Sequence, residues 1–463
     1  MVRTDISRVD TLLQQLADSR ATAIIEGHNE IDGRSLVAAT TAWIEKLRRR
    51  QVNAGEVCAF IGEFGAQSIP LLLALMSMKA IAMPLTLSAL PELERLLAIA
   101  GAQWLIRLDR DLNSSVEPVE KLGDLPHNQL IDQFRQLKHA GLIVFTSGSS
   151  GEPKGILHDF ERVLGKFDKK RPGWRTILFL PIDHFGGINT LLGCLAHQGV
   201  GICLANRAPE TVCAAIAATH AELLPTTPTF LNVLLASGLV SAYDLSSLRL
   251  ITYGAEPMPQ ATLNRITAIF PQVKLKQTYG LSELGVLHSK SPDEKSLWLK
   301  VGGDGFESRV IDGVLHIRSQ SNMIGYLNAP NPIDHDGWMS TGDLVEQRGD
   351  LVRFLGRTSE ILNVGGQKVF PAEIEDILIA APRVADATVF GVPHPLVGQA
   401  VCARVSLVAP EDPDAAVTRL RAHCREHLAK FKVPMRFEIV DVAAHVSNRN
   451  KKLRTMNKQA NNE

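Results

Sequence analysis

The stretch Thr146-Ser-Gly-Ser-Ser-Gly-Glu-Pro-Lys-Gly155 directly follows the apolar run Leu142-Ile-Val-Phe145. A short apolar run before a glycine-rich turn is typical of a buried strand that ends in a loop. Glycines at 148, 151 and 155 permit close backbone approach, hydroxyls at 146, 147, 149 and 150 add donors, and Lys154 adds a cation. Such a loop is suited to holding a polyphosphate with backbone N–H groups, hydroxyls and one ammonium.

The spacing of this stretch excludes two other motifs. A Walker A loop requires G-x-x-x-x-G-K-[ST], but the sixth residue counted from Gly148 is Pro153, and Lys154 is followed by glycine. A G-x-S-x-G nucleophile elbow is excluded because Ser149 and Ser150 lack the required flanking glycines. Taken alone, the stretch could also be a solvated glycine- and serine-rich turn.

Length and composition indicate an ordinary globular protein with more than one domain. The chain has 463 residues, of which 45% are hydrophobic and 21% charged. The formal net charge of +0 argues against a general nucleic-acid or anionic-membrane binder. The six cysteines form no C-x-x-C motif, which favours buried free thiols in a reducing cytosol.

Neither a signal peptide nor a membrane span is expected. The N-terminal residues lack the apolar region of a signal peptide. The most apolar window, residues 69–87, contains Lys79 and Pro84, so it reads as a buried helix followed by a strand. We therefore expect a cytoplasmic protein.

Hydrophobic periodicity alternates between strand-like and helix-like segments through much of the chain. Strands are expected at 55–61, 81–84, 104–106, 142–145, 176–180, 201–204, 248–252 and 273–277, and helices at 68–80, 92–100, 188–197 and 210–219. This alternation predicts a parallel sheet covered by helices. Ligands of such sheets bind beyond the carboxyl ends of the strands. Residues 1 to about 50 are expected to be helical and amphipathic.

The pattern changes in the last third of the chain. Short strands with Gly, Asp and Asn turns from about 297 to 354 indicate a small β-barrel-like subdomain. A helix beginning at Pro371, strands at 387–392 and 401–408, and a helix near 414–428 indicate a compact α+β domain. We thus expect an N-terminal α/β domain of stacked sheets, residues 1–358, and a small C-terminal α+β domain, residues 359–463.

The stretch at 146–155 closely resembles the phosphate loop of the acyl-adenylate-forming (AMP-binding) enzymes, which include acyl-CoA and aryl-CoA ligases, luciferases and the adenylation domains of peptide synthetases. Further segments resemble motifs of this family in the family's order: Tyr253-Gly-Ala-Glu-Pro257, Gln277-Thr-Tyr-Gly-Leu-Ser-Glu283, Gly337-Trp-Met-Ser-Thr-Gly-Asp343, Gly356-Arg357, Ile361 to Glu375 and Ser447 to Arg454. The joint order, over nearly the whole chain, is more specific than any single motif.

The resemblance implies a site for ATP or AMP. It implies that the Tyr279 ring packs on adenine, that the Ser282 hydroxyl meets a phosphate, that Glu283 binds Mg²⁺ and that Asp343 accepts both ribose hydroxyls. Mg²⁺ is a hard cation that uses one carboxylate together with substrate phosphates, which fits a single Glu. The implied nucleotide-binding residues are Thr146, Ser147, Gly148, Ser149, Ser150, Gly151, Lys154, Gly254, Ala255, Glu256, Gln277, Thr278, Tyr279, Ser282, Asp343 and Arg357.

The segment Phe179-Leu-Pro-Ile-Asp-His-Phe-Gly-Gly187 resembles the family's carboxylate pocket. His184 occupies the position of an aromatic residue or histidine with a direct role; a packing or capping histidine is the alternative. At the position of Phe185, amino-acid-activating relatives carry Asp and ortho-hydroxybenzoate activators carry Asn. Because burying an unpaired ammonium beside Phe185 is costly, we expect an acid other than an α-amino acid. An apolar acyl or aryl pocket is expected to be shaped by Phe185, Gly186, Gly187 and Gly280.

The resemblance also assigns roles near the hinge of the two domains. The hinge falls at Ser359, where the family usually carries Asp or Lys. Gly365 and Gly366 would line the tunnel for a pantetheine thiol, because a bare backbone leaves room for a thin chain.

A lysine near the C-terminus is expected to be catalytic. The family ends in a G-K-x-x-R segment whose lysine bridges the substrate carboxylate and the α-phosphate. The best alignment places Asn450 at the glycine, Lys451 at the catalytic lysine and Arg454 at the arginine, with Lys452 as the alternative lysine. A basic solvated tail is the alternative to a catalytic role.

The resemblance therefore implies a ligase that uses ATP and Mg²⁺ to form an acyl-AMP with release of pyrophosphate. The acyl group then passes to a thiol, with CoA as the main expectation. A phosphopantetheine of a carrier protein acting in trans, or an amine, is the nearer alternative. A non-catalytic nucleotide or acyl-adenylate sensor on the same fold is the more distant one. The sequence does not identify the acid or the oligomeric state.

Overall fold

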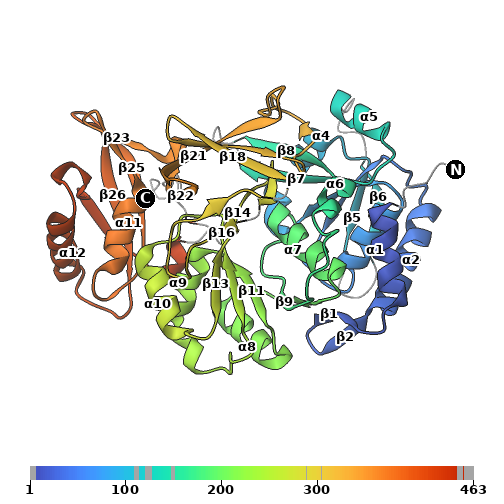
Figure 1. Cartoon of the computed structure of the whole chain (residues 1–463), viewed down its shortest axis with the longest axis horizontal. Helices are drawn as coiled ribbons and strands as arrows, with labels where there is room; N and C mark the ends of the chain where they lie inside the picture. Colours follow the sequence, from blue (N-terminus) through green and yellow to red (C-terminus); the bar gives the residue numbers. More distant parts are fainter. Residues whose placement is uncertain are drawn as a thin grey trace.

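A computed structural model describes residues 7–108, 114–119, 128–147, 152–287, 289–303, 305–445 and 452. Figure 1 shows the N-terminal elements α1 (Arg8–Asp18) and α2 (Gly33–Arg49) at one end of the molecule and the C-terminal elements at the other. Two seven-stranded sheets and a four-stranded sheet contain most of the described strands before residue 358.

The first seven-stranded sheet is parallel except at one edge. Its order is β13 (Lys274–Gln277), β12 (Leu250–Tyr253), β11 (Leu223–Thr226), β9 (Arg175–Ile177), β10 (Val200–Cys203), β1 (Thr22–Glu26) and β2 (Asn29–Asp32). Only the β1–β2 pair is antiparallel. The carboxyl ends of β9, β11, β12 and β13 therefore meet at one edge of the sheet.

The second seven-stranded sheet holds the segment that follows Leu142. Its order is β20 (Gly325–Tyr326), β8 (Pro153–Asp159), β7 (Gly141–Ser147), β4 (Ile81–Leu85), β3 (Val57–Ile61), β5 (Trp104–Arg107) and β6 (Ser115–Pro118). The strands β7, β4, β3 and β5 are parallel, whereas β7 and β8 pair as an antiparallel hairpin. Lys154 lies in β8, opposite Thr146, rather than in the loop predicted from the sequence.

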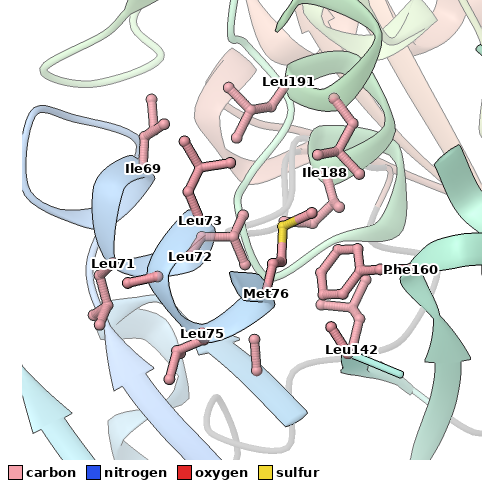
Figure 2. Close-up of a cluster of buried hydrophobic side chains, with 14 of the residues drawn as sticks. Ile69, Leu71, Leu72, Leu73, Leu75, Met76, Leu142, Phe160, Ile188 and Leu191 are labelled. Carbon is pink, nitrogen blue, oxygen red and sulfur yellow. The ribbon is translucent and has the colours of Figure 1, made fainter. Parts of the chain in front are cut away.

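A layer of helices separates the two sheets. The helix α3 (Ser68–Ser77) has the sequence SIPLLLALMS and is buried on every side, because it lies inside the protein between the sheets. Figure 2 shows its Leu72, Leu73 and Met76 beside side chains of β7, of α6 (Phe160–Gly165) and of α7 (Phe185–Ala196): Leu142, Phe160, Ile188 and Leu191. This apolar layer fixes the start of α7, and with it His184 and Phe185.

Other helices cover the outer faces of the two sheets. The first sheet is covered by α8 (Pro209–Thr219), α9 (Pro228–Ser237) and α10 (Gln260–Ile269), and the second by α4 (Leu93–Ala100) and α5 (Gln129–Arg135). Among the residues described, no helix is long and apolar enough to cross a membrane.

The segment from about 297 to 354 forms short strands, as predicted. Its main sheet is antiparallel, with the order β18 (Phe306–Ile311), β19 (Val314–Ser319), β21 (Trp338–Arg348) and β22 (Leu351–Arg357). Two small pairs precede it: β14 (Tyr279–Leu281) with β15 (Gly285–Leu287), and β16 (Ser289–Lys290) with β17 (Lys300–Val301).

After β22, the chain passes through the 3-10 turn Thr358–Glu360 into a smaller α+β unit. Its sheet has the order β24 (Gln367–Val369), β23 (Leu362–Val364), β26 (Gly398–Leu407) and β25 (Val384–His394), with β27 (Arg436–Ile439) also paired to β26. The helices α11 (Pro371–Ala380) and α12 (Pro413–His427) pack on this sheet. Figure 1 shows α11 beside α10 of the preceding region, and α9 contacts β25.

The structure corrects the prediction of a purely helical start. Thr22–Glu26 and Asn29–Asp32 form a β-hairpin between α1 and α2. The apolar residues of β1 are held by parallel pairing with β10, about 175 positions along the chain, which local periodicity does not reveal. The structure also adds β11, α9 and α10, for which no element was predicted.

Candidate nucleotide and acyl site

A cavity of about 390 Å³ lies where the ends of the parallel strands meet two hairpins. The residues that follow β9, β11, β12 and β13 reach it, as do β14–β15 and the β7–β8 pair. Among the sequence-predicted residues, the following line it: Thr146, Lys154, His184, Phe185, Gly186, Gly254, Ala255, Thr278, Tyr279, Gly280, Ser282, Glu283, Arg357 and Ser359. The structure thus brings together segments that span more than two hundred residues of sequence.

Three predicted nucleotide residues form one hydrogen-bonded group. The Tyr279 hydroxyl donates to Asp343 Oδ2 (2.7 Å), and Arg357 Nε donates to Asp343 Oδ1 (3.1 Å). Asp343 and Arg357 are cross-strand partners in β21 and β22. Burial raises the pKa of the Asp343 carboxyl, and the Arg357 guanidinium opposes that rise. Tyr279 and Arg357 line the cavity, whereas Asp343, which holds both of them, is buried and is not among the lining residues.

The Tyr279 ring is held on its other side by an aromatic contact. It stacks on Phe354 at 4.5 Å between ring centroids and 20° between planes. Burial raises the pKa of its hydroxyl well above the usual range, so the hydroxyl remains a donor to Asp343 at neutral pH. The Tyr279 ring therefore offers a rigid, flat surface on which a heteroaromatic ring can pack.

Glu283 and Lys154 meet at Tyr326, which was not singled out from the sequence. The Tyr326 hydroxyl donates to Glu283 Oε1 (2.6 Å), and Lys154 Nζ lies 5.1 Å from the centre of the Tyr326 ring. Tyr326 lies in the two-residue strand β20, which pairs with β8. That pairing brings together residues far apart in sequence, so no local pattern could have indicated the tyrosine.

His184 caps α7 and lines the cavity. Its Nδ1 accepts a hydrogen bond from the Gly186 N–H at 3.2 Å, so in the neutral ring the proton is on Nε2. His184 is therefore an N-cap, one of the roles considered from the sequence, and it also lines the cavity.

Phe185 lines the cavity, is largely buried and packs against His158. The two rings are 4.5 Å apart, and His158 Nε2 is 2.7 Å from the carbonyl oxygen of Ser282, next to Glu283. Burial lowers the pKa of His158 to about 4, so this ring is neutral at physiological pH. It therefore donates from Nε2 to that carbonyl. His158 thus connects Phe185 to the hairpin that carries Glu283. The sequence analysis did not single out His158.

The loop after β12 is strained where it reaches the cavity. Ala255 has a φ of 69°, an unusual conformation for a residue with a side chain. A Cβ on Gly254 would lie 2.5 Å from the carbonyl oxygen of Thr278, so only glycine fits there. Strain of this kind gathers at ligand sites.

Some predicted residues are not among those that line the cavity. A Cβ on Gly187 would lie 2.0 Å from the carbonyl oxygen of Pro181, so this glycine allows close packing of α7 instead of shaping the acyl pocket directly. Gln277 is buried in β13. Glu256 accepts hydrogen bonds from the hydroxyl and N–H of Thr229. Gly365 and Gly366 lie at an exposed turn with φ of 58° and 83°, away from the cavity lining.

The remaining predictions lie outside the described residues: Gly148, Ser149, Ser150, Gly151 and Lys451, together with the side chain of Ser147. Lys452 is described. Its Nζ lies 3.2 Å from Asp386 Oδ1 and donates to the carbonyl oxygen of Ala387 at 2.6 Å, both in β25. It is not among the residues that line the cavity.

The fold and the site define an AMP-binding enzyme. A model of the AMP-binding enzyme family matches residues 14–327, and a model of the AMP-binding enzyme C-terminal domain matches residues 373–452. The chain therefore belongs to this family, as the sequence motifs predicted.

Two relatives and one solved structure are especially similar. The 3-[(3aS,4S,7aS)-7a-methyl-1,5-dioxo-octahydro-1H-inden-4-yl]propanoyl:CoA ligase of Mycobacterium tuberculosis is 32% identical over 319 residues, which span 65% of this chain and 62% of that protein. A medium/long-chain fatty acid–acyl-carrier-protein ligase of the same organism, FadD10, is 28% identical over 91% of this chain and 88% of its own. The crystal structure of the anthranilate CoA ligase AuaEII in complex with anthranoyl-AMP shares the fold, with a TM-score of 0.82, 21% identity and coverage of 97% and 96%.

Proposed function

We propose that the protein is an AMP-forming ligase that activates a carboxylic acid with ATP and transfers the acyl group to a thiol. The observation that carries this proposal is the cavity lined by Tyr279, Arg357, Glu283, Lys154 and His184, with the Asp343 carboxylate hydrogen-bonded to Tyr279 and Arg357. Membership of the AMP-binding enzyme family supports it. The relatives named above are acid–CoA and acid–carrier-protein ligases.

In the adenylation step, the carboxylate oxygen attacks the α-phosphorus of ATP and the bond from that phosphorus to the pyrophosphate oxygen breaks. The products are acyl-AMP and pyrophosphate. Catalysis of such a step depends on positioning and charge neutralisation. Asp343 would accept the ribose hydroxyls, and Tyr279 would support the base. Thr146 and Lys154, with the loop 147–151, would hold the phosphates.

A Mg²⁺ ion fits the residues of the cavity. Glu283 is the only carboxylate among the described residues that line it, and Mg²⁺ in phosphate sites uses one or two carboxylates together with substrate phosphates. When bound, the ion would neutralise phosphate charge. Tyr326 orients the Glu283 carboxylate by donating to Oε1.

We assign the catalytic lysine to Lys451 rather than Lys452. The ammonium of Lys452 is engaged by Asp386, by Glu375 at 3.6 Å and by a backbone carbonyl, and its side chain is only 7% exposed. An ammonium committed to two carboxylates would have to leave them before it could bridge a substrate carboxylate and a phosphate. The lysine one position earlier is then the one that bridges the two.

The acid is proposed to be an apolar acyl or aryl acid. Apolar side chains and glycines line the part of the cavity beside α7: Leu180, Pro181, Phe185, Gly186, Gly280, Leu281 and Val286. Phe185 offers no partner to an α-ammonium, and burying an unpaired ammonium is costly. His184 faces the cavity at the start of α7, where it would lie beside the reacting carboxylate.

For the second step we propose that residues 359–463 form a mobile domain that turns about Ser359. Ser359 lies in the 3-10 turn between β22 and β23 and lines the cavity. The turn at Gly365 and Gly366 would then approach the site and admit a pantetheine arm. The thiol attacks the acyl carbon and AMP leaves. CoA is the proposed acceptor, and a carrier protein is the second candidate because the FadD10 match spans 91% of this chain.

The experiment that tests the proposal is acid-dependent exchange between ATP and pyrophosphate. We would use fatty, cyclic and aromatic acids, with α-amino acids as controls. Exchange with an apolar acid, followed by thioester formation with CoA or with a phosphopantetheinylated carrier protein, would support the proposal and identify the acceptor. ATP binding without exchange for any acid would overturn it in favour of a sensor.

Because the six cysteines are free and buried, we also propose that the protein is located in a reducing cytoplasm.

A further inference from the structure

A buried polar network joins the two domains near residue 452. Its centre is Asp386 in β25, which has no exposed surface. Asp386 Oδ1 accepts a hydrogen bond from Asn232 Nδ2 of α9 at 3.0 Å and pairs with Lys452 Nζ at 3.2 Å. Asn232 Oδ1 in turn accepts from the Thr262 hydroxyl of α10 at 2.6 Å, and both residues are buried. The helices α9 and α10 of the N-terminal domain and the sheet of the C-terminal domain are therefore connected through the Asp386 carboxylate.

Lys452 is held from both its side chain and its backbone. Its ammonium lies between Asp386 and Glu375, and Glu375 is also fixed because its Oε1 accepts from the Val389 N–H at 3.0 Å. Its backbone N–H donates to Glu256 Oε1 at 2.6 Å. Glu256 follows Ala255 and Gly254, which line the cavity. Lys452 thus links β25 to the loop 254–257.

A buried ion pair of this kind is poorly explained as a device for stability. Removing the two charges from water costs about as much free energy as their attraction returns. In some proteins, such pairs instead favour one arrangement of the structure over others. Here, the contacts of Lys452 with Asp386 and Glu375 lie within the C-terminal domain and would move with it. The contacts from Asn232 to Asp386 and from Lys452 to Glu256 cross between the domains and would break when the domain turns.

We propose that Lys452 is a positioning residue for the adenylation step. It joins β25 to the loop 254–257 through its ammonium and its backbone N–H, and so holds the two domains in the arrangement proposed for adenylation. The contact between Asn232 and Asp386 holds the two domains in the same arrangement. This inference rests on the proposed function and on the assignment of Lys451 as the catalytic lysine. It gives Lys452 a positioning role that is distinct from catalysis.

The test separates the two half-reactions. Lys452→Met removes the ammonium and keeps the length of the side chain. We expect acyl-AMP formation to slow by about 10- to 100-fold through kcat, with little change in the KM for ATP, because small misplacement of a catalytic group costs up to about a hundredfold. Thioester formation from supplied acyl-AMP and CoA should stay within about twofold. Lys432→Met is the matched control, since Lys432 pairs with Glu373 on the surface of the same domain, outside this network.

The second variant, Asn232→Ala, removes the contact across the domains and leaves the charges of the C-terminal domain paired. It should slow acyl-AMP formation and spare thioester formation, and it carries the test if Lys452→Met does not fold by circular dichroism. Equal losses in both half-reactions, or no loss in either, would overturn the inference. Absence of acyl-AMP formation by the unmutated protein would instead overturn the proposed function.

Discussion

The substitution Asp343→Asn isolates the contribution of one carboxylate to nucleotide binding. In the structure, Asp343 accepts from the Tyr279 hydroxyl and from Arg357 Nε, and it is 7% exposed. Asn keeps the shape and one oxygen acceptor but loses the charge. A hydrogen bond to a charged group contributes about 1.5–3 kcal/mol. Loss of that contribution for the ribose corresponds to a rise of about 10- to 150-fold in the KM for ATP.

Folding should be largely unaffected by this substitution. Burial raises the pKa of Asp343, so the folded state already disfavours its ionised form, and the neutral amide avoids that cost. The Arg357 side chain that loses its partner is 51% exposed and can be solvated. A melting temperature close to that of the unmutated protein would therefore accompany the weakened ATP binding.

The assay is the ATP dependence of pyrophosphate exchange at saturating acid. Asp350→Asn is the matched control, because Asp350 pairs with Lys300 on the surface at 72% exposure and lies just before β22. Such pairs contribute about 0–1 kcal/mol, so the control should change the KM for ATP little. An unchanged KM for Asp343→Asn, or an equal rise in both variants, would refute the assignment of Asp343 to the ribose.

Three further outcomes follow from the site and its surroundings. Lys451→Ala should slow acyl-AMP formation by about 10²–10³ in kcat, the scale of losing one preorganised charge contact, and a rate near that of the unmutated enzyme would contradict the assignment. Glu283→Gln should raise the Mg²⁺ concentration for half-maximal exchange, since Mg²⁺ prefers carboxylate oxygen; an unchanged titration would remove Glu283 as a metal ligand. Burial lowers the pKa values of His158 and His445 to about 4, below the ordinary 6.5. The unfolded chain then binds more protons between pH 6.5 and 4, so stability should fall with falling pH by up to about 1.4 kcal/mol per unit for each histidine. Denaturant titrations at several pH values check this, and His158→Gln should show a shallower decline.

The sequence predicted the parts of the site that depend on local pattern. The strand that runs into Thr146, the strand that ends at Tyr253 and the helix that begins near His184 are short segments with buried apolar residues. The motifs lie at the ends of the two strands and at the start of the helix. Since parallel strands end at one edge of their sheet, the order of strands and motifs was enough to place these residues together. Motif spacing therefore contained much of the tertiary information about the cavity.

The residues that escaped prediction act through partners distant in sequence. Tyr326 reaches Glu283 because a two-residue strand pairs with β8, and His158 reaches the Ser282 carbonyl from the far end of the same strand. Neither residue belongs to a periodic segment with a chemical motif. The position of Gly187 in a glycine pair suggested that it shapes a pocket. In the structure, a Cβ at this position would instead meet the backbone of Pro181.

The two adjacent lysines show where sequence spacing reaches its limit. Alignment favoured Lys451 but left Lys452 open, because either residue can be counted as the lysine of the motif. Only the tertiary structure shows that the ammonium of Lys452 pairs with Asp386, 66 positions earlier, and that Asp386 is bonded to Asn232, 154 positions before it. A buried cation with two carboxylates is costly to form and costly to break. This network holds Lys452 between β25 and the loop 254–257, and we therefore propose Lys451 rather than Lys452 as the catalytic lysine.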